Sequence, residues 1–224
     1  LAQLVTEEKN WFIVFGSLCL DRPCGGLNPV AVEIAGKLGT KVIWMPTFDS
    51  EQDNKKRGNP GQGIRVIDDK GELLPVVRDI LALIREFRMV LATGHLSREE
   101  IFRLVPAARE MGIEQIVITH PMTRAVGPTL GIEDQVKLAQ MGAWIEHCFV
   151  ACMPLHDRVA PAEIAAAIKA VGPERTLLAS DFGQLHNPSP VEGLRMFAQT
   201  MIRCGIDPQD VRRMMVDNPR RLLG

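Results

Sequence analysis

The sequence lacks the features that mark membrane-embedded, secreted or nucleic-acid-binding proteins. No run of the chain approaches the roughly 18 apolar residues that a membrane-spanning helix needs. Lys and Arg together number 26 and Asp and Glu 27, so the net charge of −1 offers no basic surface for nucleic acid or anionic lipid. The chain starts at Leu1, and no charged-then-apolar leader precedes the folded pattern. We therefore expect a cytoplasmic protein with no nucleic-acid or membrane partner.

The sequence also lacks a regular cysteine pattern. Its five cysteines are an odd number without even spacing, which argues against a disulfide framework. Cys148 and Cys152 are four residues apart, a spacing that zinc could use on a helix, but no second pair accompanies them. The sequence therefore predicts reduced thiols at Cys19, Cys24, Cys148, Cys152 and Cys204.

What is present suits one globular domain over 1–224 with a sizeable core, since 46% of the residues are hydrophobic. Apolar and β-branched runs predict six strands, at 12–18, 41–47, 89–93, 115–119, 143–147 and 176–180. Amphipathic or capped segments predict helices at 29–38, 75–87, 98–111, 131–141, 161–170, 190–203 and 208–222, the last interrupted at Asn218–Pro219. Composition further predicts a helix-compatible start at 1–11, a mobile loop at 51–63 and a small hairpin insertion at 64–74.

The order of these elements restricts the fold. Strands that alternate with helices imply parallel pairing through right-handed crossovers, in either an open doubly wound sheet or an incomplete eight-fold barrel. The Gly-x-Gly-x-x-Gly turn of a dinucleotide fold is absent, because neither Gly94 nor Gly183 sits in one. Reactive side chains at the carboxyl ends of several strands are typical of a βα barrel. We predict an α/β, TIM-barrel-like (β/α)8 fold with six βα units present and the first two strands absent.

One pattern recurs along the chain, an apolar run followed at once by an ionisable residue. The clearest case is Asp181 after the run Leu177–Ser180, because a carboxylate that ends a buried strand has few uses unless a cation meets it. The parallel strands of a barrel would bring such residues to one rim. The candidates at or just after strand ends are Asp49, His95, His120, Glu146, His147, Asp181 and His186.

Short motifs in the same places resemble a known family. Those that resemble the amidohydrolase superfamily of metal-dependent barrels are Thr93-Gly94-His95, Thr119-His120-Pro121, Ser180-Asp181 and the terminal Asn218–Gly224. Those that resemble an uncharacterised amidohydrolase-like branch are Gly25–Pro29, Trp44–Thr47 and Asp181–Pro188. The similarity runs over nearly the whole chain, and the motifs occur in the right order.

The resemblance implies a metal site. The family places metal ligands as a His-x-His pair on strand 1, one histidine each on strands 5 and 6, and an aspartate on strand 8. If the six strands are the family's third to eighth, the matching residues are His95, His120 and Asp181, and the His-x-His pair would belong to the absent strands. Strand 4 ends without a lysine or glutamate to bridge two metals, which favours a mononuclear site unless Asp49 serves.

The implied chemistry is hydrolysis by a metal-activated water. Histidine and carboxylate ligands suit Zn²⁺ best here, with Mn²⁺ or Fe²⁺ as alternatives. Asp181, with His120, would be catalytic, while Glu146, His147, His186 and Asp49 would orient substrate or support the ligands. The expected substrate is a small polar molecule with a C–N, ester or lactone bond. The open alternatives are a metal-dependent decarboxylase, a phosphoesterase and a non-catalytic ligand-binding barrel, and a homo-oligomer is also left open.

Overall fold

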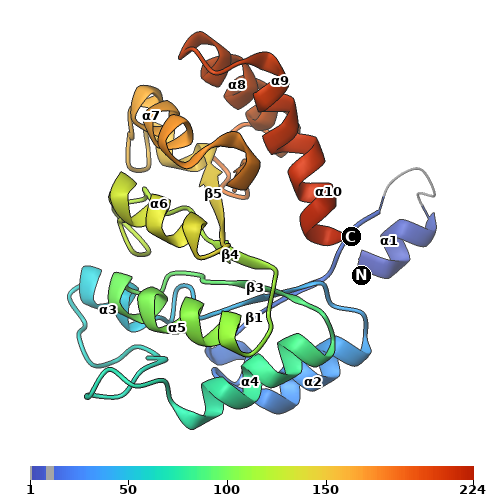
Figure 1. Cartoon of the computed structure of the whole chain (residues 1–224), viewed down its shortest axis with the longest axis vertical. Helices are drawn as coiled ribbons and strands as arrows, with labels where there is room; N and C mark the ends of the chain where they lie inside the picture. The colour runs from blue at the N-terminus through green and yellow to red at the C-terminus, as the bar shows by residue number, and fades with distance from the viewer. Residues whose placement is uncertain (1, 9–12) are drawn as a thin grey trace. The chain divides into compact units, whose positions relative to one another are not determined.

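The computed structural model describes residues 2–8 and 13–224, and the chain forms two compact units, Leu1–Ile116 and Val117–Gly224. Six short parallel strands, β1 to β6, alternate with helices along the chain (Figure 1). This is the α/β pattern of a partial TIM barrel, which confirms the predicted fold class. The single-domain organisation stays a prediction. Within the described residues, no helix has both the length and the apolar character needed to cross a membrane.

The first unit contains three strands that pair in parallel, β1 (Ser17–Cys19), β2 (Val42–Trp44) and β3 (Val90–Ala92). Leu18 lies opposite Ile43, which lies opposite Leu91. All three residues of β3 are fully buried, as expected of a strand covered on both faces. The helices of this unit are α1 (Ala2–Glu8), α2 (Pro29–Lys37), α3 (Glu51–Lys56), α4 (Pro75–Glu86) and α5 (Arg98–Glu110).

The predicted strand at 12–18 is shorter and later than expected. Only Ser17–Cys19 forms β1, and residues 13–16 have no regular structure. Pairing starts where Lys41 N donates to Gly16 O at 2.9 Å, so the neighbouring strand and not the apolar run sets the strand's length. Ile13 is 68% exposed, in keeping with its position outside the sheet. Residue 12 of the predicted strand, and residues 1 and 9–11 of the helix-compatible start, lie outside the described residues.

The prediction of a loop over 51–63 is wrong for its first half, which forms α3. Ser50 Oγ accepts a hydrogen bond from Asp53 N at 3.1 Å and caps the helix. Acidic residues in the first turn and lysines in the last suit the helix dipole. Glu51 then holds the rest of the segment, because its carboxylate accepts from Gly61 N at 2.8 Å and Gly63 N at 2.9 Å. Capping outweighed the loop-like composition.

Residues 64–74 form a tight turn between α3 and α4. Ile67 and Leu73 form an isolated antiparallel bridge, and Asp68 N donates to Glu72 O at 2.8 Å. The segment is tied to α5, because Val66 N donates to Glu100 Oε1 at 3.0 Å. The same glutamate completes the predicted capping box with Ser97 at the start of α5.

The second unit repeats the alternation with strands β4 (Ile116–Ile118), β5 (Trp144–Cys148) and β6 (Thr176–Ala179). Val117 lies opposite Trp144, and Ile145 lies opposite Thr176. Its core includes Phe149 and Phe197, whose stacked rings have centroids 4.8 Å apart. The helices are α6 (Ile132–Gln140), α7 (Pro161–Val171), α8 (Pro190–Arg203), α9 (Pro208–Arg212) and α10 (Asn218–Leu223).

The last predicted helix is interrupted earlier than expected. A π-helical turn, Arg213–Asp217, separates α9 from α10 before the chain reaches Asn218–Pro219. Pro219 has no N–H to donate to the preceding turn, so a wider turn before it avoids an unmet bond. Asn218 is buried and its Nδ2 donates to Pro173 O and Thr176 O, both at 2.7 Å. The asparagine therefore ties the C-terminal helix to the start of β6.

Candidate active site

Polar side chains follow the carboxyl ends of the strands in both units. His95 comes three residues after β3 and His120 two residues after β4, while Glu146 and His147 lie on β5. Asp181 comes two residues after β6. This is the placement that the sequence predicts, and it is where βα barrels carry reactive groups. The ligand set itself stays a prediction.

The approach of the chain to His95 depends on Gly94. This glycine has φ +57°, and a Cβ there would lie 2.3 Å from Met45 O and 2.8 Å from Pro46 O. No other residue could occupy the position without displacing backbone. His95 N then donates to Pro46 O at 3.0 Å, so the end of β3 is fixed against the loop after β2.

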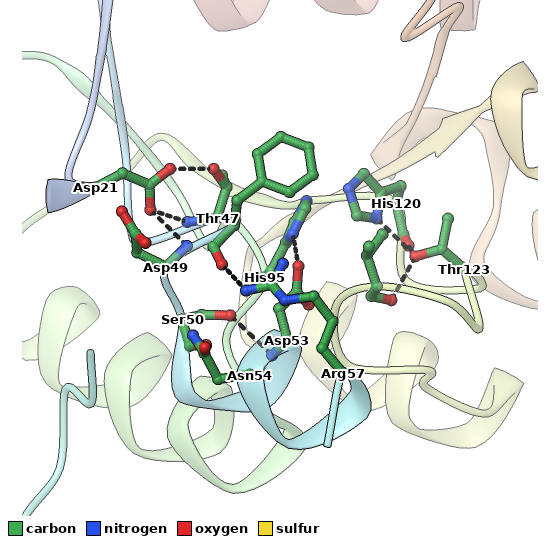
Figure 2. Close-up of polar contacts among 12 residues, drawn as sticks. Asp21, Thr47, Asp49, Ser50, Asp53, Asn54, Arg57, His95, His120 and Thr123 are labelled. Atoms are coloured by element: carbon green, nitrogen blue, oxygen red, sulfur yellow. Dashed lines mark hydrogen bonds and ion pairs between the residues drawn. The ribbon is translucent and has the colours of Figure 1, made fainter. Parts of the chain in front are cut away.

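The His95 ring is held by a buried carboxylate from α3. Its Nδ1 lies 2.6 Å from Asp53 Oδ2, and Asp53 is only 1% exposed (Figure 2). A carboxylate offers acceptor atoms, so the contact assigns the hydrogen to Nδ1 and the lone pair to Nε2. Phe48 packs edge-on against the same ring, with centroids 5.5 Å apart.

The predicted candidate Asp49 belongs to a network around Asp21, at the ends of β1 and β2. Asp21 accepts from Thr47 N at 2.8 Å, Thr47 Oγ1 at 2.5 Å and Asp49 N at 3.2 Å (Figure 2). It also accepts from Cys19 Sγ at 3.2 Å. Burial alone would raise the pKa of Asp21, but these bonds, led by those from Thr47, outweigh it and the pKa is lowered. Asp49 in turn accepts from Arg22 N at 2.7 Å. The network joins the two strand ends.

His120 is held by a hydroxyl close to it in the sequence. Thr123 Oγ1 lies 2.8 Å from His120 Nδ1, 2.9 Å from His120 O and 3.1 Å from Val126 O (Figure 2). Carbonyl oxygens only accept, so when the single hydroxyl hydrogen goes to one of them, Nδ1 is the donor to Oγ1; the tautomer assigned on this basis is Nδ1–H. The tautomer assigned to His120 is therefore the same as that of His95. His120 also has φ +23°, an uncommon backbone conformation for a side chain of this size.

Glu146 and Asp181 influence each other at the ends of β5 and β6. Glu146 lies opposite Leu177 in the register, and Asp181 follows with φ +52°. Burial, and then the negative charge of Asp181, raise the pKa of Glu146 to about 7. Glu146 is half-buried and Asp181 is exposed, so the pair combines a carboxyl group that is partly protonated near neutral pH with an accessible acidic side chain.

His147 does not share the position of Glu146. Successive side chains of a strand point to opposite faces, so His147 lies on the other side of β5. It is 1% exposed, and its Nε2 has no hydrogen-bond partner among the described residues. Burial lowers the pKa of His147 to about 4. The structure therefore separates these two adjacent candidates.

His186 contacts a histidine from another loop of the second unit. Its Nε2 lies 3.1 Å from His156 Nε2, and Asn187 Nδ2 lies 3.3 Å from the same atom. The contact links the loop after β5 to the loop after β6, at the carboxyl ends of both strands. His186 is exposed and sits at the rim, in keeping with a residue that could meet a ligand.

Sequence reasoning missed the groups that hold the two histidines. Ser50-Glu51-Gln52-Asp53 fits the pattern of a helix N-terminus, with an acid three residues after a serine, and could have revealed α3. Nothing local indicates that Asp53 meets a histidine 42 positions away. Thr123 follows His120 by three residues, but a threonine in a loop has many uses.

The donor chemistry of both histidines fits a metal ion. Each ring has Nδ1 bound to an oxygen of its own unit, and metal-binding histidines commonly hold Nδ1 in this way and ligate through Nε2. Of the predicted ligands, the first unit contains His95 and the second His120 and Asp181. In the part of the chain that the structure describes, no group of three or more His, Cys, Asp or Glu is placed to hold one ion.

The fold and these strand-end residues define a chain of the βα-barrel class. Its residues 1–146 match the model of the family described as "Family of unknown function (DUF6282)". The chain therefore belongs to this family. No curated protein sequence matches the chain.

Solved structures with a similar fold include those of an amidohydrolase, a deacetylase and a metallo peptidase. An amidohydrolase from Pseudomonas aeruginosa has a TM-score of 0.61 at 14% identity, covering 88% of this chain and 67% of that one. An N-acetyl-D-glucosamine-6-phosphate deacetylase from Mycobacterium smegmatis has a TM-score of 0.58 at 19% identity, covering 100% and 60%. A metallo peptidase from Rhodobacter sphaeroides has a TM-score of 0.64 at 14% identity, covering 99% and 66%.

At these identities the likeness concerns the fold alone. The shared fold agrees with the predicted βα-barrel pattern. The chain spans 60% to 67% of the length of these three proteins.

Proposed function

We propose that the protein is a metal-dependent hydrolase of the amidohydrolase type, acting on a C–N, ester or lactone bond of a small polar molecule. The observation that carries the proposal is that His95 and His120 have the same position after a strand and the same hydrogen-bonding pattern at Nδ1. Each follows a parallel strand, and each has Nδ1 bound to an oxygen, the contact that commonly supports a histidine ligating through Nε2. Similar folds among an amidohydrolase, a deacetylase and a metallo peptidase support the reaction class.

In this proposal His95, His120 and Asp181 hold a divalent cation, Zn²⁺ before Mn²⁺ or Fe²⁺. Such an ion supplies Lewis-acid polarisation of the scissile bond and lowers the pKa of a bound water. Asp181, exposed at the end of β6, accepts the proton of the attacking water and passes it to the leaving group. Glu146, with its pKa raised to about 7, donates a hydrogen bond to substrate or to Asp181 near neutral pH.

Of the three other candidates, two take lesser parts and one takes none. Asp49 supports the loop after β2 through Arg22 and meets substrate only at the edge of the site. His186, exposed beside His156, contacts substrate from the rim. His147 is left out of the proposed site, because it lies on the opposite face of β5 from Glu146.

Metal content tests the proposal. After expression with Zn²⁺, Mn²⁺ and Fe²⁺ and exhaustive dialysis, we expect elemental analysis to find about one equivalent of one of them per chain. His120→Ala and Asp181→Asn should lose most of that metal and all turnover of any dipeptide, N-acyl amino acid, ester or lactone that the wild type hydrolyses. Glu133→Gln, which changes an exposed side chain of α6, should retain both. Wild-type metal below about a tenth of an equivalent would contradict the proposal.

A further inference from the structure

We propose that Asp53 is a positioning residue for His95, and that the segment 50–64 serves to hold it in place. The inference deepens the proposed function and rests on it for the role of the metal. The orientation of the ring itself is a separate and directly measurable claim. Asp53 lies on a helix that composition predicts to be a mobile loop, so its role follows only from the contacts of the folded chain.

The contact between Asp53 and His95 is short and shielded from water. Asp53 Oδ2 and His95 Nδ1 are 2.6 Å apart, and the two side chains are 1% and 8% exposed. Burying a carboxylate without a hydrogen-bond donor costs free energy, and this cost favours the paired arrangement. The geometry places the hydrogen on Nδ1 and makes Nε2 the ligating nitrogen.

The segment around Asp53 is built to fix its position. Ser50 caps α3 through Asp53 N at 3.1 Å, so the aspartate occupies the first turn of the helix. The Glu51 carboxylate accepts hydrogen bonds from Gly61 N and Gly63 N, which holds the segment after α3 against the start of that helix. Asn54 Nδ2 also donates to Ser50 O at 2.9 Å. The contacts of these three residues therefore restrain the helix that carries Asp53.

The ring is restrained from two other directions. The backbone of His95 is fixed to Pro46 O at 3.0 Å, through the close approach that Gly94 allows. Phe48, which is 65% exposed, meets the ring edge-on and limits its rotation. With backbone, ring edge and Nδ1 all held, the direction of Nε2 is set before any ligand arrives. Such preorganisation is what gives supporting groups their effect on metal affinity.

The tautomer of His95 in the metal-free protein is the first measurement. Two-bond ¹H–¹⁵N spectra recorded at about pH 8.5, well above the ordinary histidine pKa of about 6.5, distinguish Nδ1–H from Nε2–H. His95→Gln identifies the signal by its loss. We expect the wild type to show Nδ1–H and Asp53→Ala to show Nε2–H, the form that free histidine prefers in water. Asp53→Asn, whose Oδ1 can still accept, should retain Nδ1–H.

The second measurement is the affinity for Zn²⁺, determined by chelator competition. Asp53→Ala should weaken binding by about 10- to 100-fold and Asp53→Asn by less, the range seen when supporting groups of metal ligands are removed. Asp69→Asn is the matched control, because Asp69 is an exposed aspartate paired with Arg65 in the same unit. It should change neither the spectrum nor the affinity.

The outcomes separate the inference from the proposed function. Nε2–H in the wild type, or an Asp53→Ala protein with unchanged tautomer and affinity, overturns the positioning role even if the protein is a metalloenzyme. Nδ1–H in a wild type that binds no Zn²⁺ leaves the positioning of His95 intact and overturns the proposed function instead. The wild-type spectrum decides the tautomer even if Asp53→Ala fails to fold.

Discussion

His147 shows at the residue scale how one buried side chain sets a pH limit on the fold. Burial lowers its pKa from 6.5 to about 4 in the folded protein. Between those values the unfolded chain binds more protons than the folded one, so stability rises with pH across that window. The stabilisation is fully present above about pH 6.5 and is lost as the pH falls towards 4. At 1.4 kcal/mol per pKa unit it amounts to at most about 3 kcal/mol.

We expect His147→Leu to flatten this dependence. The free energy of urea unfolding, measured from about pH 7.5 to pH 4.5, should fall less steeply in the variant than in the wild type. His186→Gln, which removes an exposed histidine, should leave the wild-type slope in that window. Parallel curves for His147→Leu and the wild type would show that another group carries the acid sensitivity.

The candidate site could be predicted from the sequence only as far as its local signals extend. His95, His120 and Asp181 could be found because each directly follows an apolar run. The partner of His95 could not, because Asp53 reaches it only through the fold, 42 positions away. The separation of Glu146 from His147 required knowing that both lie within β5, where neighbours point to opposite faces.

At the scale of elements, the ends of β2 and β3 meet where a side chain cannot fit. Gly94→Ala would put a Cβ 2.3 Å from Met45 O and require φ +57° of an alanine. Gly58→Ala is a control that isolates the cost of a positive φ. Gly58 has φ +82°, and no atom of the described residues lies within 4 Å of where its Cβ would be. We expect Gly58→Ala to cost about 1–2 kcal/mol of unfolding free energy. Gly94→Ala should cost clearly more, by at least about 1 kcal/mol.

Urea unfolding of the two alanine variants checks this, and the His95 signal in the ¹H–¹⁵N spectrum reports whether the ring has moved. Equal losses of unfolding free energy for Gly94→Ala and Gly58→Ala would mean that the loop after β2 moves at little cost to make room for the Cβ. His95 would then owe its position to Asp53 and Phe48.

Elements could be predicted where pattern and packing agree. The capping box at Ser97 and the apolar side of 75–87 predicted α5 and α4 almost to the residue. Composition failed at 51–63, because the cap at Ser50 and the bonds of Glu51 outweigh a polar, glycine-containing sequence. The first strand was misplaced because its apolar run is longer than its partner β2.

For the whole molecule, the spacing of strands and helices predicts a parallel α/β pattern, and the polar residues at the strand ends favour a barrel over an open sheet. Six strands alternate with helices in sequence order, as the regular spacing of apolar runs indicates. The sequence could not reveal the division into Leu1–Ile116 and Val117–Gly224, because that depends on which residues pack together. That division matters for function, because His95 belongs to the first unit while His120 and Asp181 belong to the second.

An ion held by both His95 and His120 would make the stability of the chain depend on Zn²⁺ through either residue. At a free Zn²⁺ concentration about 100 times its Kd, binding adds about 2.7 kcal/mol, worth roughly 5–10 °C in Tm for a chain of this size. We expect a chelator to remove that increment from the wild type and from Glu133→Gln. His95→Ala and His120→Ala should each abolish it, although the two residues belong to different units.

The double variant provides the decisive comparison. If both histidines hold one ion, either substitution already removes its stabilisation, so the double variant loses no further Zn²⁺-dependent Tm and the cycle is strongly non-additive. If each histidine bound an ion of its own, the two losses would add, as they do for independent sites. Additive losses would therefore exclude a single ion held by both His95 and His120, whatever metal content the wild type shows.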